Sequence, residues 1–259
     1  MSETILSTFS GGVLTVELNR PQVHNAFNAR MVTELTQVFQ EQARQDDVRI
    51  VTLRGRGPSF CAGADISSMR AAADADLEDN RSDALRIFDL MFAVNDCSKP
   101  VVACVQGAVF GGGVGLVSAC DIVIAAENTT FAFSETRLGL IPAVISPFVV
   151  AKIGESQARE LFLTGERFDA TRAQRLGLVH HLAPVAALAA VLDERVETLL
   201  QAGPQAQAEA KALIRDVVSR PIRKVRELTA ERIAERRASD EGREGLSAFL
   251  EKRPPKWRK

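Results

Sequence analysis

The feature that most constrains the fold is a repeated order of short apolar segments and helical segments, which continues to about residue 184. Val13–Leu18, Val48–Leu53 and Val101–Val105 are each short enough to be single strands. Segments with helical spacing of their apolar residues separate the later strands. This order predicts an α/β fold in which mostly parallel strands are covered by helices on both faces.

Local signals set the ends of several elements. Gly11-Gly12 separates Ile5–Phe9 from Val13–Leu18, which predicts a strand pair with a tight turn. Asn28 is placed to cap a helix. The apolar face of that helix is Met31, Leu35, Val38 and Phe39.

Further along the chain, we expect helices over 67–72 and 82–96, the second ending before Pro100. We also expect strands at Asp121–Ala125 and Phe131–Phe133, and a helix that begins at the glycine run 111–113.

Beyond residue 200 the pattern becomes helical, with breaks at Gly203-Pro204 and Arg220-Pro221. We therefore expect a core over 1–200 and a C-terminal helical region over 201–259. The second region holds 15 Lys and Arg against 9 Asp and Glu. That excess suits a solvated helical face, a phosphate-bearing ligand or a partner subunit.

Composition excludes some classes of function. A formal charge of −1 argues against general electrostatic binding to nucleic acid or to an anionic membrane. The N-terminus has no signal-peptide pattern, and no apolar run is long enough to span a membrane. We expect a cytoplasmic protein.

The four cysteines show no metal-ligand spacing, which favours buried, reduced thiols; they are Cys61, Cys97, Cys104 and Cys120. Cys61 lies beside a glycine-rich loop, so a catalytic thiol is an alternative there. The three histidines provide no metal set, and we expect no bound metal.

Two small-residue segments are suited to bind a ligand through their backbone. Ser59–Ile66 follows a strand and is rich in Gly and Ala, so a ligand can approach its N–H groups closely. In Gln106–Gly115 a strand runs into glycines and then into an apolar helix, whose N-terminus attracts negative charge. Either segment is also consistent with a simple turn.

A dinucleotide-binding loop is a rival reading of the second segment. Gly111, Gly113 and Gly115 supply two G-x-G pairs, but the third glycine of G-x-G-x-x-G is missing in both registers. We also expect no strand to end immediately before Gly111.

Glu135 follows a short apolar strand and precedes Leu138-Gly139-Leu140-Ile141-Pro142. Apolar surroundings raise the pKa of a carboxyl group and suit it to general acid or base work. The alternative is an ordinary ion pair with Arg137. The sequence contains neither a G-x-S-x-G nucleophile elbow nor a P-loop.

At these stretches the sequence resembles the crotonase superfamily, the enoyl-CoA hydratases and isomerases. The resemblance runs from Leu18-Asn19-Arg20-Pro21 and Asn25-Ala26-Phe27 to Ala248–Arg253. It implies a ClpP/crotonase-like spiral of β-β-α units with a C-terminal helical trimerisation region. It also implies an acyl-CoA substrate, no separate cofactor, and assembly into a homotrimer or a dimer of trimers.

The resemblance assigns roles to individual residues. The N–H groups of Ala64 and Gly112 would form an oxyanion hole for the thioester, and Glu135 would be the acid/base. Residues expected along the coenzyme-A path are Val23, Ala26, Ala62, Asp65, Ile66 and Ser67. Phe249 and Lys252 would reach the nucleotide end of coenzyme A, either in their own subunit or from an adjacent subunit.

The sequence departs from two-glutamate hydratases at Gly115, where the first glutamate would stand. The stretches 110–116 and 134–143 resemble bacterial 3-methylglutaconyl-CoA hydratases of leucine degradation instead. The alternatives are a general enoyl-CoA hydratase, a double-bond isomerase, and less directly a decarboxylase or thioester hydrolase. A non-enzymatic alternative is RNA binding through the basic C-terminal helices.

Overall fold

The nine strands form two sheets in the computed structural model, which describes residues 3–258. The larger sheet has six strands in the order β1-β2-β3-β4-β6-β9, and the smaller has three in the order β5-β7-β8. The strands are β1 Ile5–Ser10, β2 Val13–Leu18, β3 Ile50–Gly55, β4 Val101–Val105, β5 Ala108–Phe110, β6 Ile122–Ala126, β7 Thr130–Ala132, β8 Arg167–Asp169 and β9 His181–Ala183.

Helices cover both faces of the larger sheet and continue beyond it. They are α1 Ala29–Gln40, α2 Ile66–Asp74, α3 Leu77–Asp96, α4 Gly112–Ala119, α5 Ser146–Thr164, α6 Ala170–Arg175, α7 Leu188–Leu200, α8 Pro204–Val218, α9 Arg226–Ala238 and α10 Asp240–Leu250. Short 3-10 helices span Pro21–Val23, Gln42–Arg44, Ser134–Leu138, Val185–Ala187 and Ile222–Lys224.

In the larger sheet, β1 and β2 pair antiparallel and every later pair is parallel. As in any β-strand, successive side chains of β3 point to opposite faces of the sheet. Val51 and Leu53 pack into the main core with α1, α3 and α4, whereas Ile50 packs under α7. All five residues of β4 are buried, which is why this strand reads as a continuous apolar run. The predicted α/β class is confirmed.

Several predicted ends are confirmed, and others were wrong. Asn28 caps α1, because its side-chain oxygen accepts a hydrogen bond from the N–H of Met31 at 2.9 Å. The helix expected over 82–96 begins earlier, at Leu77, where the Asp76 side chain accepts from the N–H of Asp79. The expectation that no strand ends immediately before Gly111 was wrong, because β5 of the small sheet ends at Phe110.

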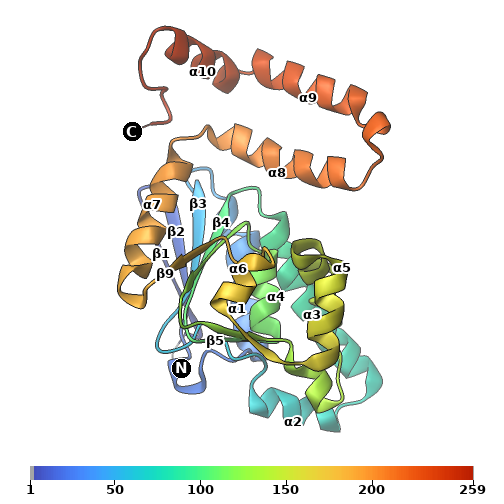
Figure 1. The fold of residues 1–259 in the computed structure, drawn as a ribbon. Helices are drawn as coiled ribbons and strands as arrows, with labels where there is room; N and C mark the ends of the chain where they lie inside the picture. The colour runs from blue at the N-terminus through green and yellow to red at the C-terminus, as the bar shows by residue number, and fades with distance from the viewer. Residues whose placement is uncertain (1–2, 259) are drawn as a thin grey trace.

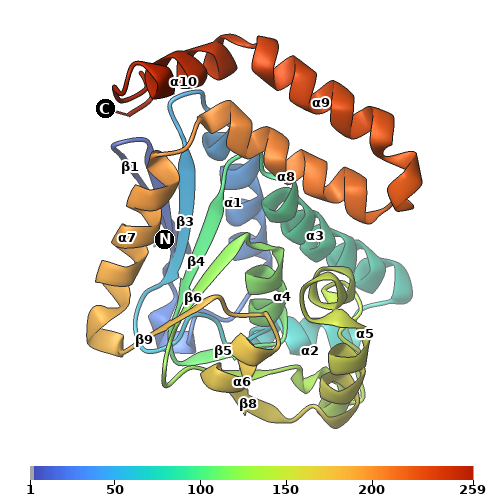
Figure 2. The same cartoon turned by 45° about the horizontal axis from the view of Figure 1, so that its top comes forward.

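The C-terminal helices lie apart from the sheet. Figures 1 and 2 show α8, α9 and α10 as an arm at one end of the molecule, with α2 and β5 towards the other end. We call residues 201–258 the arm and residues 3–200 the core. Within the described residues, no helix has the length and apolar character needed to cross a membrane.

Candidate active site

Backbone hydrogen bonds hold the two small-residue segments of the sequence side by side. The N–H of Phe60 donates to the carbonyl of Gln106 at 2.8 Å, and the N–H of Cys61 to that of Ala108 at 3.1 Å. The N–H of Phe110 returns a bond of 2.9 Å to the carbonyl of Cys61. The predicted ligand-binding segments are therefore one structural unit.

Two N–H groups of this unit remain available for a ligand. The bonds from Phe27 N–H to Gly63 O (2.7 Å) and from Asp65 N–H to Phe27 O (2.8 Å) flank Ala64. The N–H of Ala64 itself has no acceptor among residues 3–258. Gly112 is the first residue of α4, so its N–H has no partner within the helix.

Glycine is required at the point where these segments meet the carboxyl group. Gly63 and Gly111 have φ of 96° and 49°, a backbone conformation that favours glycine. A Cβ added at Gly111 would lie 3.1 Å from Oε1 of Glu135. A Cβ at Gly112 would lie 3.0 Å from the ring of Phe27. The Glu135 carboxylate thus lies beside Gly111, in the space that a side chain at this position would need, directly before the predicted oxyanion hole.

Glu135 is a half-buried carboxyl group without a charged partner among the described residues. It lies in the 3-10 helix Ser134–Leu138, and its Oε2 is buried without a hydrogen-bond partner there. Burial raises the pKa of Glu135. The alternative ion pair with Arg137 is wrong, because that guanidinium donates to the carbonyl of Thr164 at 3.3 Å. The environment suits a group that exchanges protons.

Arg20 joins the two loops that carry the expected coenzyme-A residues. Its guanidinium donates to the carbonyl of Ala26 at 2.6 Å and to the carboxylate of Asp65 at 2.6 Å. The other oxygen of Asp65 accepts from the N–H of Ser67 at 2.8 Å and starts α2. Hydrogen bonds from Ser67, then from Arg20, lower the pKa of Asp65.

Asp65 therefore uses both carboxylate oxygens inside the protein, and it is positioned to shape the loop. Ala62 is tied to the first loop by a bond of 3.0 Å from its N–H to the carbonyl of His24. Of the other expected residues, Val23 is 37% exposed and Ile66 71% exposed, and both remain accessible to a ligand.

Sequence reasoning assigned no role to Arg20 or to Asn25. Asn25 is fully buried, and its side chain accepts from the N–H of Arg20 at 2.7 Å and donates to the carbonyl of Ser59 at 2.8 Å. Both residues lie in the motifs that carry the family resemblance, and those motifs are the signal that could have identified them.

A family model described as enoyl-CoA hydratase/isomerase matches residues 8–259 of the chain. The chain belongs to this family. The enoyl-CoA hydratase AKT6-1 of Alternaria alternata is 37% identical to it over 205 residues, which are 79% of this chain and 67% of that protein.

Solved structures agree over nearly the full length. An enoyl-CoA hydratase from Shewanella pealeana has a TM-score of 0.95 and 41% identity, covering 98% of this chain and 96% of that one. Pseudomonas aeruginosa AtuE also has a TM-score of 0.95 and 41% identity, over 99% of this chain and 100% of that one. The predicted crotonase fold is confirmed, and chemistry on enoyl-CoA thioesters follows from the family.

Two of the expected binding residues lie far from this site within the chain. Phe249 at the end of α10 is 80% exposed, and Lys252 follows it in a left-handed conformation with φ of 57°. Figures 1 and 2 place α10 in the arm, away from α2 and β5. The structure does not bring Phe249 and Lys252 together with Glu135 in one chain.

The structure also bears on two alternatives from the sequence, a catalytic thiol at Cys61 and a dinucleotide-binding loop. Cys61 is not a reactive thiol, because complete burial raises its pKa to about 12. All four cysteines are buried and free. A strand, β5, does end immediately before Gly111, as a dinucleotide-binding loop requires. The third glycine of the G-x-G-x-x-G motif is still missing, which argues against such a loop. No group of three His, Cys, Asp or Glu residues within 3–258 is arranged to hold a metal.

Proposed function

We propose that this protein is a single-glutamate hydratase that interconverts 3-methylglutaconyl-CoA and 3-hydroxy-3-methylglutaryl-CoA. The observation that carries the proposal is the carboxyl group of Glu135. It is half-buried, has a raised pKa, and lies against the glycine turn that leads to the N–H of Gly112. The identity of the acyl group is taken from the likeness of stretches 110–116 and 134–143 to 3-methylglutaconyl-CoA hydratases.

In the hydration direction, ionised Glu135 takes a proton from the water whose oxygen attacks C3. The π electrons of the C2–C3 bond move towards C1, and the thioester carbonyl oxygen becomes the oxygen of an enolate. Glu135 then returns the proton to C2 and the carbonyl re-forms. General acid/base catalysis of this kind contributes about 10²–10⁴-fold.

The N–H groups of Ala64 and Gly112 are the donors that would stabilise the enolate oxygen. Both belong to the backbone, and the hydrogen bonds around them are intact before substrate arrives. Fixed donors therefore need no reorganisation when charge develops, and removal of one such donor typically costs about 2.7–4 kcal/mol.

The arm fits a further part of the proposal, the homotrimer. Phe249 and Leu250 are 80% and 79% exposed, two adjacent large apolar side chains at the end of α10 that a neighbouring copy could cover. In a trimer, Phe249 and Lys252 would contact the coenzyme-A nucleotide of a neighbouring copy. Analytical ultracentrifugation should give the mass of three or six chains, and an active monomer would contradict this part.

Turnover of 3-methylglutaconyl-CoA beside crotonyl-CoA, with mass analysis of the products, tests the substrate. We expect 3-hydroxy-3-methylglutaryl-CoA as product and much slower hydration of crotonyl-CoA. Fast hydration of crotonyl-CoA would indicate a general hydratase and overturn the acyl assignment. No water addition to either thioester would overturn the hydratase assignment.

Glu135→Gln tests the proposed proton transfer. We expect kcat to fall by about 10²–10⁴-fold, because the amide cannot exchange the proton. The matched control is Glu127→Gln, since Glu127 is an exposed residue at the end of β6. Near-full turnover by Glu135→Gln with an intact fold would show that another group moves the proton.

Double-bond isomerisation is the second candidate, because one acid/base beside an enolate site also suffices for that reaction. Isomerisation moves a proton between carbons and adds no water, so the product has the mass of the substrate. The same mass analysis therefore separates the two activities.

A further inference from the structure

Gly111 precedes α4 and Gly115 lies within it, and side chains at these two positions would meet very different neighbours. Gly115 comes three residues after Gly112, the first residue of α4, so positions 112 and 115 lie about one turn apart on one face of the helix. A Cβ at Gly111 would lie 3.1 Å from the carboxylate of Glu135. A Cβ at Gly115 would lie 2.2 Å from Cγ2 and 2.8 Å from Cβ of Ile145.

These distances mean that Ile145 occupies the volume into which any side chain at position 115 would extend. The methyl of Met91 closes the same volume, 3.5 Å from that position. One helical turn after Gly112, position 115 of α4 therefore faces hydrocarbon and not a polar group. A carboxylate placed there would meet the side chain of Ile145 before it reached the substrate.

Ile145 is held firmly in this position. It is 2% exposed and lies immediately before α5, and its carbonyl accepts the N–H of Val149 at 3.1 Å. The next residue, Ser146, donates its hydroxyl to the carbonyl of Ala143 at 2.7 Å. Because the start of α5 fixes the backbone, Ile145 cannot withdraw without disturbing the helix.

We propose that Ile145 is the residue that limits this site to one carboxylate, and that it is paired sterically with Gly115. The pair excludes a second acid/base, and with it a water molecule held between two carboxylates. Ile145 is in this sense a specificity-determining residue for the proposed single-glutamate reaction, on which this inference rests. It acts through the space it fills and not through its own chemistry.

A double-mutant cycle in stability tests the steric part without any substrate. Gly115→Ala in the wild-type background should raise the unfolding equilibrium constant by about 10-fold or more, as overpacked core sites do. In an Ile145→Gly background the same change should have almost no cost, because both clashing atoms are gone. The matched control is Ile153→Gly, since Ile153 is a buried residue of α5 whose atoms do not clash with a Cβ at Gly115.

The cycle with Ile153→Gly should be additive, because removal of the Ile153 side chain does not relieve the clash at position 115. If Gly115→Ala costs the same with and without Ile145, the steric pairing is wrong. This readout does not depend on the substrate. If the wild-type protein does not turn over 3-methylglutaconyl-CoA, the proposed function is wrong, but the steric pairing of Ile145 and Gly115 is unaffected.

Hydration of crotonyl-CoA tests the catalytic part. Gly115→Glu combined with Ile145→Gly should hydrate crotonyl-CoA about 10-fold or more faster than Ile145→Gly alone, because the second carboxylate can then help to hold water. Gly115→Glu alone should give no gain. If the single variant Gly115→Glu folds and hydrates crotonyl-CoA as fast as the double variant, Ile145 does not exclude a second carboxylate.

Discussion

The core and the arm are built in different ways, and the difference indicates which of them is stable on its own. In α4, seven of eight residues are buried, and β4 is buried throughout. In the arm, α8 and α9 have no buried residue and α10 has one, Ala248. Since burial of apolar surface is the main driving force of folding, the core holds nearly all of it.

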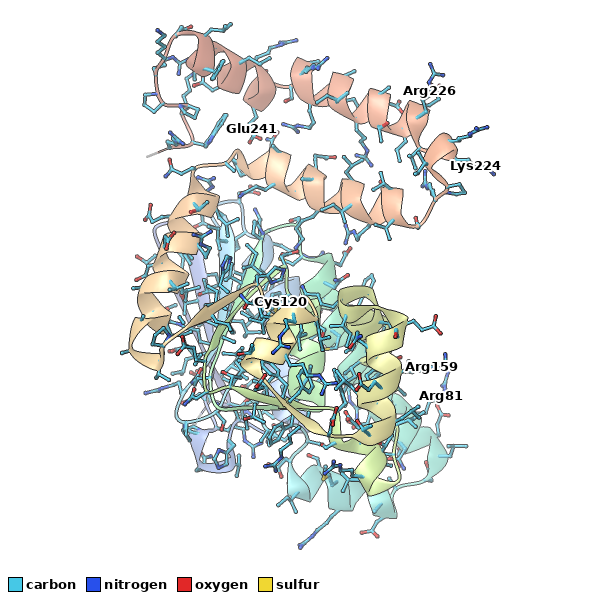
Figure 3. All side chains as sticks on the ribbon, in the orientation of Figure 1. Arg81, Cys120, Arg159, Lys224, Arg226 and Glu241 are labelled. Atoms are coloured by element: carbon cyan, nitrogen blue, oxygen red, sulfur yellow. The ribbon has the colours of Figure 1, made fainter. Side chains whose placement is uncertain are left out.

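Polar contacts attach the arm to the core. Lys211 of α8 binds Asp121 at 2.6 Å, and Arg215 binds Asp96 at 2.6 Å. Within the arm, the carboxylate of Glu241 accepts the N–H groups of Gln205 and Ala206 at the start of α8, at 3.0 and 2.8 Å. Figure 3 shows Glu241 between α10 and α8. Ion pairs near the surface each contribute about 0–1 kcal/mol, so the pairs of Lys211 and Arg215 alone hold the arm only weakly.

Seven large apolar side chains of the arm are at least half exposed. They are Ile214, Val218, Ile222, Ile233, Leu246, Phe249 and Leu250. The comparison teaches that the core buries most of its apolar residues within the chain, whereas the arm leaves many of its own available to another surface. The proposed trimer supplies that surface.

The largest expected effect comes from a matched pair of phenylalanine truncations. Phe133 is fully buried, with its ring centroid 4.9 Å from that of Phe162, so Phe133→Ala should lower the free energy of unfolding by about 3–5 kcal/mol. Phe249→Ala removes an exposed ring and should cost about 0.5 kcal/mol or less in the isolated chain. Urea unfolding measures both values.

Protein concentration sharpens the result. If Phe249 packs against another copy, its truncation should cost more as the protein is concentrated, while the cost at Phe133 stays constant. Equal losses from the two substitutions in dilute solution would break the comparison, since the arm would then have an apolar core of its own.

A smaller effect is expected where Arg49 joins arm and core. Its guanidinium donates to the carbonyls of Trp257 at 2.9 Å and Ala202 at 2.7 Å, and the indole N–H of Trp257 donates to Gln201 at 3.1 Å. Hydrogen bonds to charged groups are worth about 1.5–3 kcal/mol. Arg49→Met should therefore loosen the C-terminal tail locally.

Trp257 is the single tryptophan of the chain, so its fluorescence reports on this junction directly. We expect red-shifted emission and easier quenching in Arg49→Met, with core unfolding nearly unchanged. Arg159→Met is the control, because Arg159 is an exposed residue of α5 that pairs with Glu155 on its own helix (Figure 3). Unchanged Trp257 emission in Arg49→Met would show that other contacts hold the tail.

Strong local signals were sufficient for much of the fold. The ends of β2 and β4 were predicted correctly, because each is a short apolar run bounded by turn residues or proline. β5 and β8 were missed, because strands of three residues carry little periodicity and depend on partners far along the chain. The early start of α3 depends on a cap at Asp76, ahead of any apolar repeat.

The site divides in the same way. Glu135 and the two small-residue segments were found from local chemistry, because an apolar environment and glycine runs are visible in a short window. The bonds of Arg20 and the position of Ile145 are contacts between distant parts of the chain. They require the assembled loops, and no spacing in the sequence indicates them.

The smallest expected effect concerns the site, where the core departs from its own pattern of satisfied burial. Oε2 of Glu135 is buried without a hydrogen-bond partner within residues 3–258, and burial raises the pKa of the group. The folded state therefore keeps a proton over a pH range in which the unfolded chain has lost it, and stability falls as pH rises through that range.

Glu135→Gln removes this dependence and should raise the free energy of unfolding by about 1 kcal/mol at neutral to mildly alkaline pH. Below about pH 4, where both states hold the proton, the gain should vanish. Urea unfolding across pH measures it, with Glu127→Gln as a flat control. If glutamine were less stable than glutamate at pH 8, the carboxylate would have a stabilising partner, and the core would be optimised for packing even at its site. A gain that grows as pH rises from the unfolded pKa to the raised folded pKa, and is constant above it, would instead place a local conflict of the core at the group proposed to move the proton.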